Sequence, residues 1–153
     1  MTATKEVSLV RRIAARPAIV FEACVTADGI ASWWGPDDFP TISAEADPRI
    51  GGSFRVRFRT ADGLEHECAG EFLEIVRPER VVMSWRWTMN GAVEERGRVS
   101  RLEIRLRAID AGTELTLIHS GLDSDDSVRD HEGGWSGALE KLIRRFAASR
   151  GVA

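Results

Sequence analysis

Hydrophobic residues near the end of the chain recur every three or four positions, which is the spacing of one face of an α-helix. The apolar stripe comprises Val128, His131, Trp135, Leu139, Leu142 and Phe146, widened by Ala138 and Ile143. Serine and acidic residues precede the stripe and basic residues lie near its end, as helix capping and the helix dipole favour. The pattern predicts a long amphipathic helix over residues 124–150 that requires a large apolar surface to pack against.

Apolar and polar residues alternate through most of the chain before this helix, which is the pattern of half-buried β-strands. The alternation is strict at Phe54, Val56 and Phe58, which are separated by arginines. Strands are predicted at residues 5–14, 41–46, 53–60, 64–75, 80–88, 94–108 and 113–120. Short turn sequences such as Asn90-Gly91 divide the later strands, so we expect an antiparallel sheet of about six or seven strands.

Two short helices are predicted between the first and second strands. Pro17 occupies a permitted first-turn position of a helix over residues 17–24, and Thr26 with Asp28 begins the other. The sequence Trp33-Trp34-Gly35-Pro36 must end that second helix. The order of elements predicts a single α+β domain over residues 1–153, in which the long helix covers the concave face of the sheet.

The alternation also predicts which strand residues face the long helix. The inward rows are Val81, Met83, Trp85 and Trp87; Leu102, Ile104 and Leu106; Leu115, Leu117 and His119; and Leu64, His66, Cys68, Gly70 and Phe72. Two of the three histidines therefore point towards the helix.

Three glycines, Gly133, Gly134 and Gly137, fall inside the predicted helix. Each costs about 1 kcal/mol relative to alanine in a helix interior. Either the glycines allow a close approach to the sheet or to a bound molecule, or the helix begins near Trp135 and they form the loop before it.

Length and charge narrow the possible functions. A chain of 153 residues buries a core without disulfides or a structural metal. With 21 basic and 24 acidic residues the net charge is −3, which argues against nucleic-acid partners. Cys24 and Cys68 are far apart, as expected for reduced thiols, and no stretch approaches the ~20 apolar residues of a membrane span. We therefore expect a cytoplasmic protein.

The aromatic residues indicate either a well-packed core or a cavity between sheet and helix. Five tryptophans are present, together with Phe39, Phe54, Phe58 and Phe72. Buried aromatic rings need no ligand to explain them. Rigid rings around a curved sheet also tend to leave gaps, and buried indole N–H groups require acceptors. A cavity is therefore a reasonable expectation.

No GxSxG, GxxxxGK, HExxH or GxGxxG signature occurs in the chain. The three histidines lie on separate elements without the spacing of metal ligands, so no metal site and no cofactor are predicted. Glu65 and Glu67 project to the outer face of the sheet, where we expect them to pair with Arg55, Arg57 or Arg59 on a solvated surface.

Two histidines are candidates for acid–base catalysis. His119 ends the last strand and His131 lies early in the helix, so the two can approach each other near the mouth of the cavity. The alternative for each is a hydrogen-bonded structural role. Arg11, in the inward row of the first strand, either meets an anionic group of a ligand or reaches solvent at the strand end.

Several short sequences, in order along the chain, carry a family resemblance. They are Arg16-Pro17-Ala18, Trp33-Trp34-Gly35-Pro36, Gly51-Gly52-Ser53-Phe54, Gly70-Glu71-Phe72-Leu73-Glu74-Ile75, Pro78-Glu79-Arg80-Val81-Val82, Gly112-Thr113-Glu114-Leu115-Thr116-Leu117 and Gly134-Trp135. The chain resembles the Activator-of-Hsp90-ATPase-homologue-1-like group of the START-like (SRPBCC, Bet v 1-like) superfamily. The resemblance implies the helix-grip fold, a curved sheet and a long C-terminal helix that enclose a cavity with two short helices. Members include lipid carriers, hormone binders, cyclases and co-chaperone domains, so activity must be argued from the site.

Three functions follow as expectations. The first is the binding of a small hydrophobic or aromatic molecule, with a homodimer as a further possibility. Its predicted contacts are Trp33, Trp34, Phe39, Phe58, His66, Met83, Trp85, Trp87, His119 and Trp135. The second is a cyclase-like or hydrolase-like enzyme with His119 or His131 as the general acid or base. The third is a stress-response or co-chaperone-like interaction module.

Overall fold

A computed structural model describes residues 5–36, 39–89 and 98–150, the last three of these as backbone only. The sheet is antiparallel and has the strand order β1-β7-β6-β5-β4-β3-β2. Its strands are β1 (Lys5–Ile13), β2 (Ser43–Ala46), β3 (Ser53–Arg59), β4 (Glu65–Val76), β5 (Arg80–Met89), β6 (Ser100–Ile109) and β7 (Gly112–Leu122). The consecutive strands β2 to β7 form a meander, and β1 pairs with β7.

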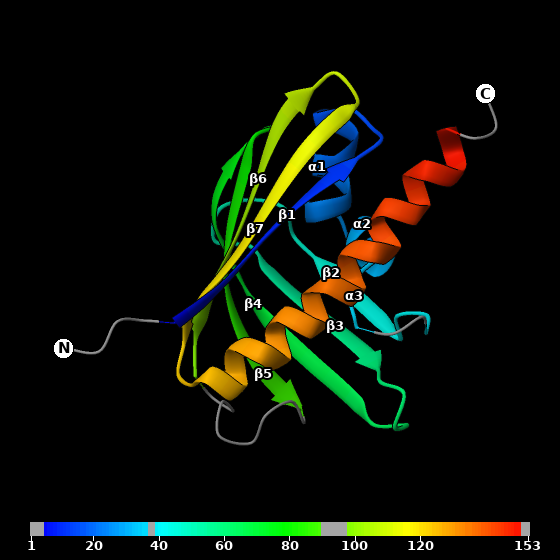
Figure 1. Cartoon of the computed structure of the whole chain (residues 1–153). Helices are drawn as coiled ribbons and strands as arrows, with labels where there is room; N and C mark the ends of the chain where they lie inside the picture. Colours follow the sequence, from blue (N-terminus) through cyan, green and yellow to red (C-terminus); the bar gives the residue numbers. More distant parts are fainter. Residues whose placement is uncertain (1–4, 37–38, 90–97, 151–153) are drawn as a thin grey trace.

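The long helix α3 (Asp125–Arg150) lies across one face of the curved sheet (Figure 1). Its predicted stripe is the buried side, since His131, Trp135, Leu139 and Leu142 are all buried. Ser124 caps the first turn, because its hydroxyl oxygen accepts a hydrogen bond from the Ser127 amide at 3.0 Å. The amphipathic pattern therefore predicted both the helix and the face that packs on the sheet.

Two short helices, α1 (Pro17–Val25) and α2 (Ala27–Ala31), precede the meander. Thr26 separates them and caps α2 by accepting a hydrogen bond from the Gly29 amide at 3.0 Å. The indole N–H of Trp33 donates to the Ala23 carbonyl at 2.8 Å and so ties the chain after α2 back to α1. This contact leads directly into the turn that carries Trp34.

The structure corrects some sequence expectations. Leu64 does not belong to the inward row of β4, because it precedes that strand and is 51% exposed. The helix does not begin near Trp135, since α3 starts at Asp125 and includes all three glycines. The Asn90-Gly91 turn and the first part of the strand predicted at residues 94–108 lie outside the described residues.

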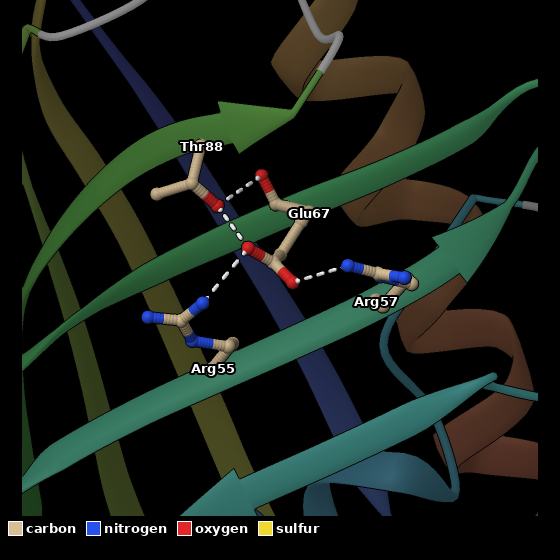
Figure 2. Close-up of polar contacts among 4 residues, drawn as sticks. All are labelled: Arg55, Arg57, Glu67 and Thr88. Carbon is tan, nitrogen blue, oxygen red and sulfur yellow. Dashed lines mark hydrogen bonds and ion pairs between the residues drawn. The ribbon is translucent and has the colours of Figure 1, made fainter.

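The outer face of the sheet holds a buried carboxylate (Figure 2). The Glu67 side chain is only 7% exposed and pairs with Arg55 at 3.3 Å and Arg57 at 3.2 Å. The Thr88 hydroxyl donates to Glu67 Oε1 at 2.6 Å, and this bond and the arginines lower the pKa of the carboxyl group. The predicted pairing of Glu67 with arginines is confirmed. The sequence also predicted a solvated surface here, but the Glu67 side chain is buried.

Replacing Glu67 with glutamine should therefore destabilise the fold. We expect Glu67→Gln to lower the free energy of unfolding by about 1–2 kcal/mol, because charge-assisted hydrogen bonds are lost in a covered site. Glu65→Gln is the matched control, since Glu65 pairs with Arg59 in a half-exposed position and such pairs contribute about 0–1 kcal/mol. Urea unfolding at pH 7 measures both, and equal losses would contradict the special role of Glu67.

Candidate ligand-binding cavity

A cavity of about 310 Å³ lies between the sheet, the turn after α2 and helix α3. Strands β3, β4 and β5 supply one wall and the helix supplies the other. The lining residues are Trp34, Gly35, Pro36, Phe58, Thr60, His66, Cys68, Trp85, Trp87, Asp130, His131, Gly134 and Trp135. This volume is within the range of small-molecule sites in proteins.

Most of the predicted contact residues meet at this cavity. Trp34, Phe58, His66, Trp85, Trp87 and Trp135 line it, as does the candidate catalytic residue His131. The other four predicted residues do not. Trp33, Met83 and His119 are completely buried in the core outside the lining, and Phe39 is 46% exposed.

Several polar and small lining residues were not predicted from the sequence. Thr60 continues the inward row of Phe54, Val56 and Phe58 one step beyond the end of β3, so extending the alternation would have found it. Asp130 and Pro36 gave no such signal, because their position depends on how the helix and the turn meet.

Gly137 allows α3 to pack closely against the turn after α2. A Cβ atom there would lie 2.2 Å from the Pro36 carbonyl oxygen, far inside van der Waals contact. A Cβ atom at Gly134 would lie 4.0 Å from the Pro36 side chain, and one at Gly133 would meet nothing within 4 Å. Of the three glycines in α3, Gly137 alone is explained by a close approach within the protein, and α3 approaches the turn at Pro36 there and not the sheet.

The aromatic rings around the cavity meet at steep angles. Trp34 and Trp135 are perpendicular, with ring centroids 5.2 Å apart. Trp85 and Trp87 meet at 81° with centroids 4.6 Å apart. Edge-to-face pairs of this kind stabilise each other, so the walls are preorganised as well as apolar.

His119 is held in one neutral form by its hydrogen bonds. The Trp135 indole N–H donates to His119 Nδ1 at 3.0 Å, so Nδ1 carries no proton. The neutral ring then has its proton on Nε2, which donates to the Ser100 hydroxyl at 2.7 Å, and Ser100 donates to the Trp85 carbonyl at 3.1 Å. Burial and the neighbouring His131 keep the pKa of His119 well below its usual value.

These contacts give His119 a positioning role for two cavity walls. The His119 and His131 rings do approach each other, with centroids 4.5 Å apart. His119 is fully buried outside the lining, however, and its hydrogen bonds tie Trp135 of α3 to Trp85 of β5 through Ser100. Of the two candidate catalytic histidines, only His131 faces the cavity, where it packs edge-to-face on Trp85.

The polar part of the lining comes from the hairpin between β3 and β4. The Thr60 hydroxyl lies 3.0 Å from His66 Nε2 and also contacts the Asp62 carboxylate. The His66 ring stacks on Phe58 with centroids 5.5 Å apart. Desolvation lowers the pKa of His66, and the nearby Asp62 carboxylate opposes this shift only in part.

The two thiols are not activated nucleophiles. Both cysteines are free and buried, and burial raises the pKa of Cys24 to about 12. Burial also raises the pKa of Cys68, which lines the cavity. The buried indole N–H of Trp34 has no hydrogen-bond partner among the described residues, and that of Trp85 has the weakly accepting Cys68 thiol beside it. The site therefore offers rings and weak polar groups and no reactive sulfur.

Arg11 does not reach the cavity. Its side chain donates a hydrogen bond to the Val10 carbonyl at 2.9 Å in an exposed setting. Among the described residues, no group of three or more histidine, cysteine or acidic side chains is placed to hold a metal ion. In the same part of the chain, no helix has the length and hydrophobicity needed to cross a membrane.

The curved sheet, the long helix against it and the cavity between them define a helix-grip protein of the START-like class. Residues 14–147 match the sequence profile described as Activator of Hsp90 ATPase homolog 1-like protein, and the chain belongs to this family. No curated protein matches the sequence significantly.

Solved structures share the fold along nearly the whole chain. The AHSA1 protein from Silicibacter pomeroyi has a TM-score of 0.81 at 23% identity, covering 95% of this chain and 99% of that one. A protein from Chromobacterium violaceum has a TM-score of 0.79 at 24% identity, covering 93% and 97%. The solution structure of an AHSA1-like protein from Aeromonas hydrophila has a TM-score of 0.71 at 20% identity, covering 97% and 96%. At these identities the similarity establishes the fold.

Proposed function

We propose that this protein binds a small apolar or aromatic molecule in the cavity between the sheet and α3. The observation that carries the proposal is the aromatic lining, in which four tryptophans and one phenylalanine surround about 310 Å³. Binding sites for small molecules are typically concave and mostly apolar, with a few polar groups that set orientation. Thr60, His66 and Asp130 are such polar groups here.

The contacts of His119, which lies behind the lining, and of Cys68, which belongs to it, favour binding over catalysis as the primary role. His119 has both ring nitrogens engaged in hydrogen bonds within the protein. Cys68 has a raised pKa, and a buried thiol of this kind is a poor nucleophile. The rings are already fixed by edge-to-face packing, so a ligand is received by a largely preformed site.

A matched pair of glycine variants tests the proposal. Gly134 lines the cavity and has room for a side chain, whereas Gly133 on the same helix faces open space. We expect Gly134→Leu to fill the cavity and weaken binding of the neutral fluorescent probe N-phenyl-1-naphthylamine by about tenfold or more, which is about 1.4 kcal/mol. Gly133→Leu should leave the affinity unchanged. The probe's fluorescence increase on titration gives both affinities.

Two results would count against the proposal. If the wild-type protein did not bind N-phenyl-1-naphthylamine, the proposed function would lose its support. Equal effects of the two leucine variants would place the probe elsewhere on the molecule. Thermal unfolding of both variants separates a filled cavity from a misfolded one, because leucine has a higher helix propensity than glycine at both positions.

A further inference from the structure

Aromatic rings in several orientations line the cavity. An aromatic ring carries negative charge density on its face, so rings that surround a void in different planes attract a positive group inside it. Here Trp34 is perpendicular to Trp135, Trp85 meets Trp87 at 81°, and Phe58 lies 6.0 Å from Trp87 at 52°. The rings thus surround the void in several planes and not as one flat stack.

The described part of the lining carries one carboxylate and two titratable histidines, His66 and His131. Among the described lining residues Asp130 supplies a carboxylate, and neither lysine nor arginine is present. A second carboxylate, Asp62, contacts the Thr60 hydroxyl at the hairpin end of the cavity. A smaller hollow shares Trp85, Trp87 and His131 with the cavity and includes Arg98, but Arg98 is paired with Asp123 at 3.0 Å.

The lining also limits the kind of cation. A primary ammonium needs several hydrogen-bond acceptors when it leaves water, whereas a methylated ammonium needs few because its surface is apolar. The acceptor side chains at this site are few, and most of its surface is apolar. An anionic ligand would meet the Asp130 carboxylate in a lining that has no lysine or arginine among the described residues.

From the rings and the carboxylate together, we infer that the ligand of this cavity carries a methylated or otherwise alkyl-substituted ammonium group. This inference rests on the proposed function, since it assigns a ligand class to the same cavity. The positive group lies among the tryptophan rings, and Asp130 at the rim contributes longer-range attraction. Neutral molecules of the same shape bind through the apolar contacts alone.

A pair of probes with the same shape tests the ligand class. Phenyltrimethylammonium and tert-butylbenzene differ only in a positive nitrogen in place of a carbon. We expect wild-type protein to bind the cation about tenfold or more tightly than the neutral compound, as attraction to several desolvated rings predicts. Titration of the indole N–H signals by NMR measures both affinities and locates the probes at the cavity tryptophans.

Two acidic positions on α3 provide the matched variants. Asp130→Asn removes the carboxylate at the cavity and should weaken cation binding several-fold without changing the affinity for tert-butylbenzene. Asp126→Asn is the control, because Asp126 is paired with Arg129 and does not line the cavity. Trp87→Leu keeps an apolar wall but removes a ring. It should therefore lower the affinity for the cation by a larger factor than the affinity for tert-butylbenzene.

The outcomes separate this inference from the proposed function. Equal affinities for the two probes, or a preference for tert-butylbenzene, would overturn the cation inference and leave the apolar site intact. Binding of N-phenyl-1-naphthylamine without binding of either phenyltrimethylammonium or tert-butylbenzene would also overturn the cation inference and leave the proposed function intact. Failure of all three compounds to bind would overturn both. A cation preference that persists in Asp130→Asn and Trp87→Leu together would place the cation outside the cavity and also overturn the inference.

Discussion

Replacing Gly137 with alanine is expected to lower the free energy of unfolding by about 1–3 kcal/mol, although alanine is the better helix former. The added Cβ atom would lie 2.2 Å from the carbonyl oxygen of Pro36, which is backbone and cannot rotate away as a side chain would. Either α3 or the turn that carries Trp34 must shift. Urea unfolding gives the loss of stability, and the indole N–H signal of Trp34 reports the shift.

Gly133→Ala is the control on the same helix. A Cβ atom at Gly133 meets nothing within 4 Å, so only the conformational preference of glycine changes there. We expect Gly133→Ala to raise the free energy of unfolding by about 0.5–1 kcal/mol. If both alanine variants were stabilised, the close contact between α3 and Pro36 would not exist in solution.

The stability of the protein is expected to fall as the pH decreases below about 6.5, with a slope from His119 of up to about 1.4 kcal/mol per pH unit. Burial, followed by the charge of His131, lowers the pKa of His119 in the folded state below its value of 6.5 in the unfolded chain. Between these two pKa values the unfolded state binds more protons, so acidification favours unfolding. The contribution of neutral His119 to the free energy of unfolding is complete above pH 6.5. It is lost as the pH falls towards the pKa of His119 in the folded state.

His119→Gln tests the origin of this slope. A glutamine amide retains one acceptor for the Trp135 indole and one donor for Ser100, but it does not titrate. We expect the variant to show a much flatter dependence of unfolding free energy on pH between 5 and 7. His66→Gln, at a half-buried position, should change the slope less. A wild-type slope in His119→Gln would show that another group titrates.

Much of the fold was predictable because alternation and helical periodicity reflect burial directly. The stripe on α3 and the inward rows through Trp85 on β5, Ile104 on β6 and Leu117 on β7 needed only the spacing of apolar residues. Glu67 shows the limit of this reasoning, because its strand position was correct but its burial depends on how arginines and Thr88 pack around it.

The cavity was predictable only in part, because facing the helix and facing a void are different properties. His119 and Met83 occupy inward positions on β7 and β5, yet both lie in the packed core. Trp33 and Trp34 are neighbours in sequence, and only Trp34 reaches the cavity, since Trp33 is bound to the Ala23 carbonyl. The backbone contact between the turn and α3 has a signature in Gly137, but that glycine alone does not reveal which segment approaches the helix.

The placement of the tryptophans gives the protein a built-in optical signal. Four of its five tryptophans line the cavity, the fifth has its ring centroid 6.0 Å from Trp135, and the chain contains no tyrosine. Near-ultraviolet absorption and emission therefore arise almost wholly from the surroundings of one site. Occupancy of the cavity can be followed in unlabelled wild-type protein, which makes screening of compound collections possible before any ligand is known.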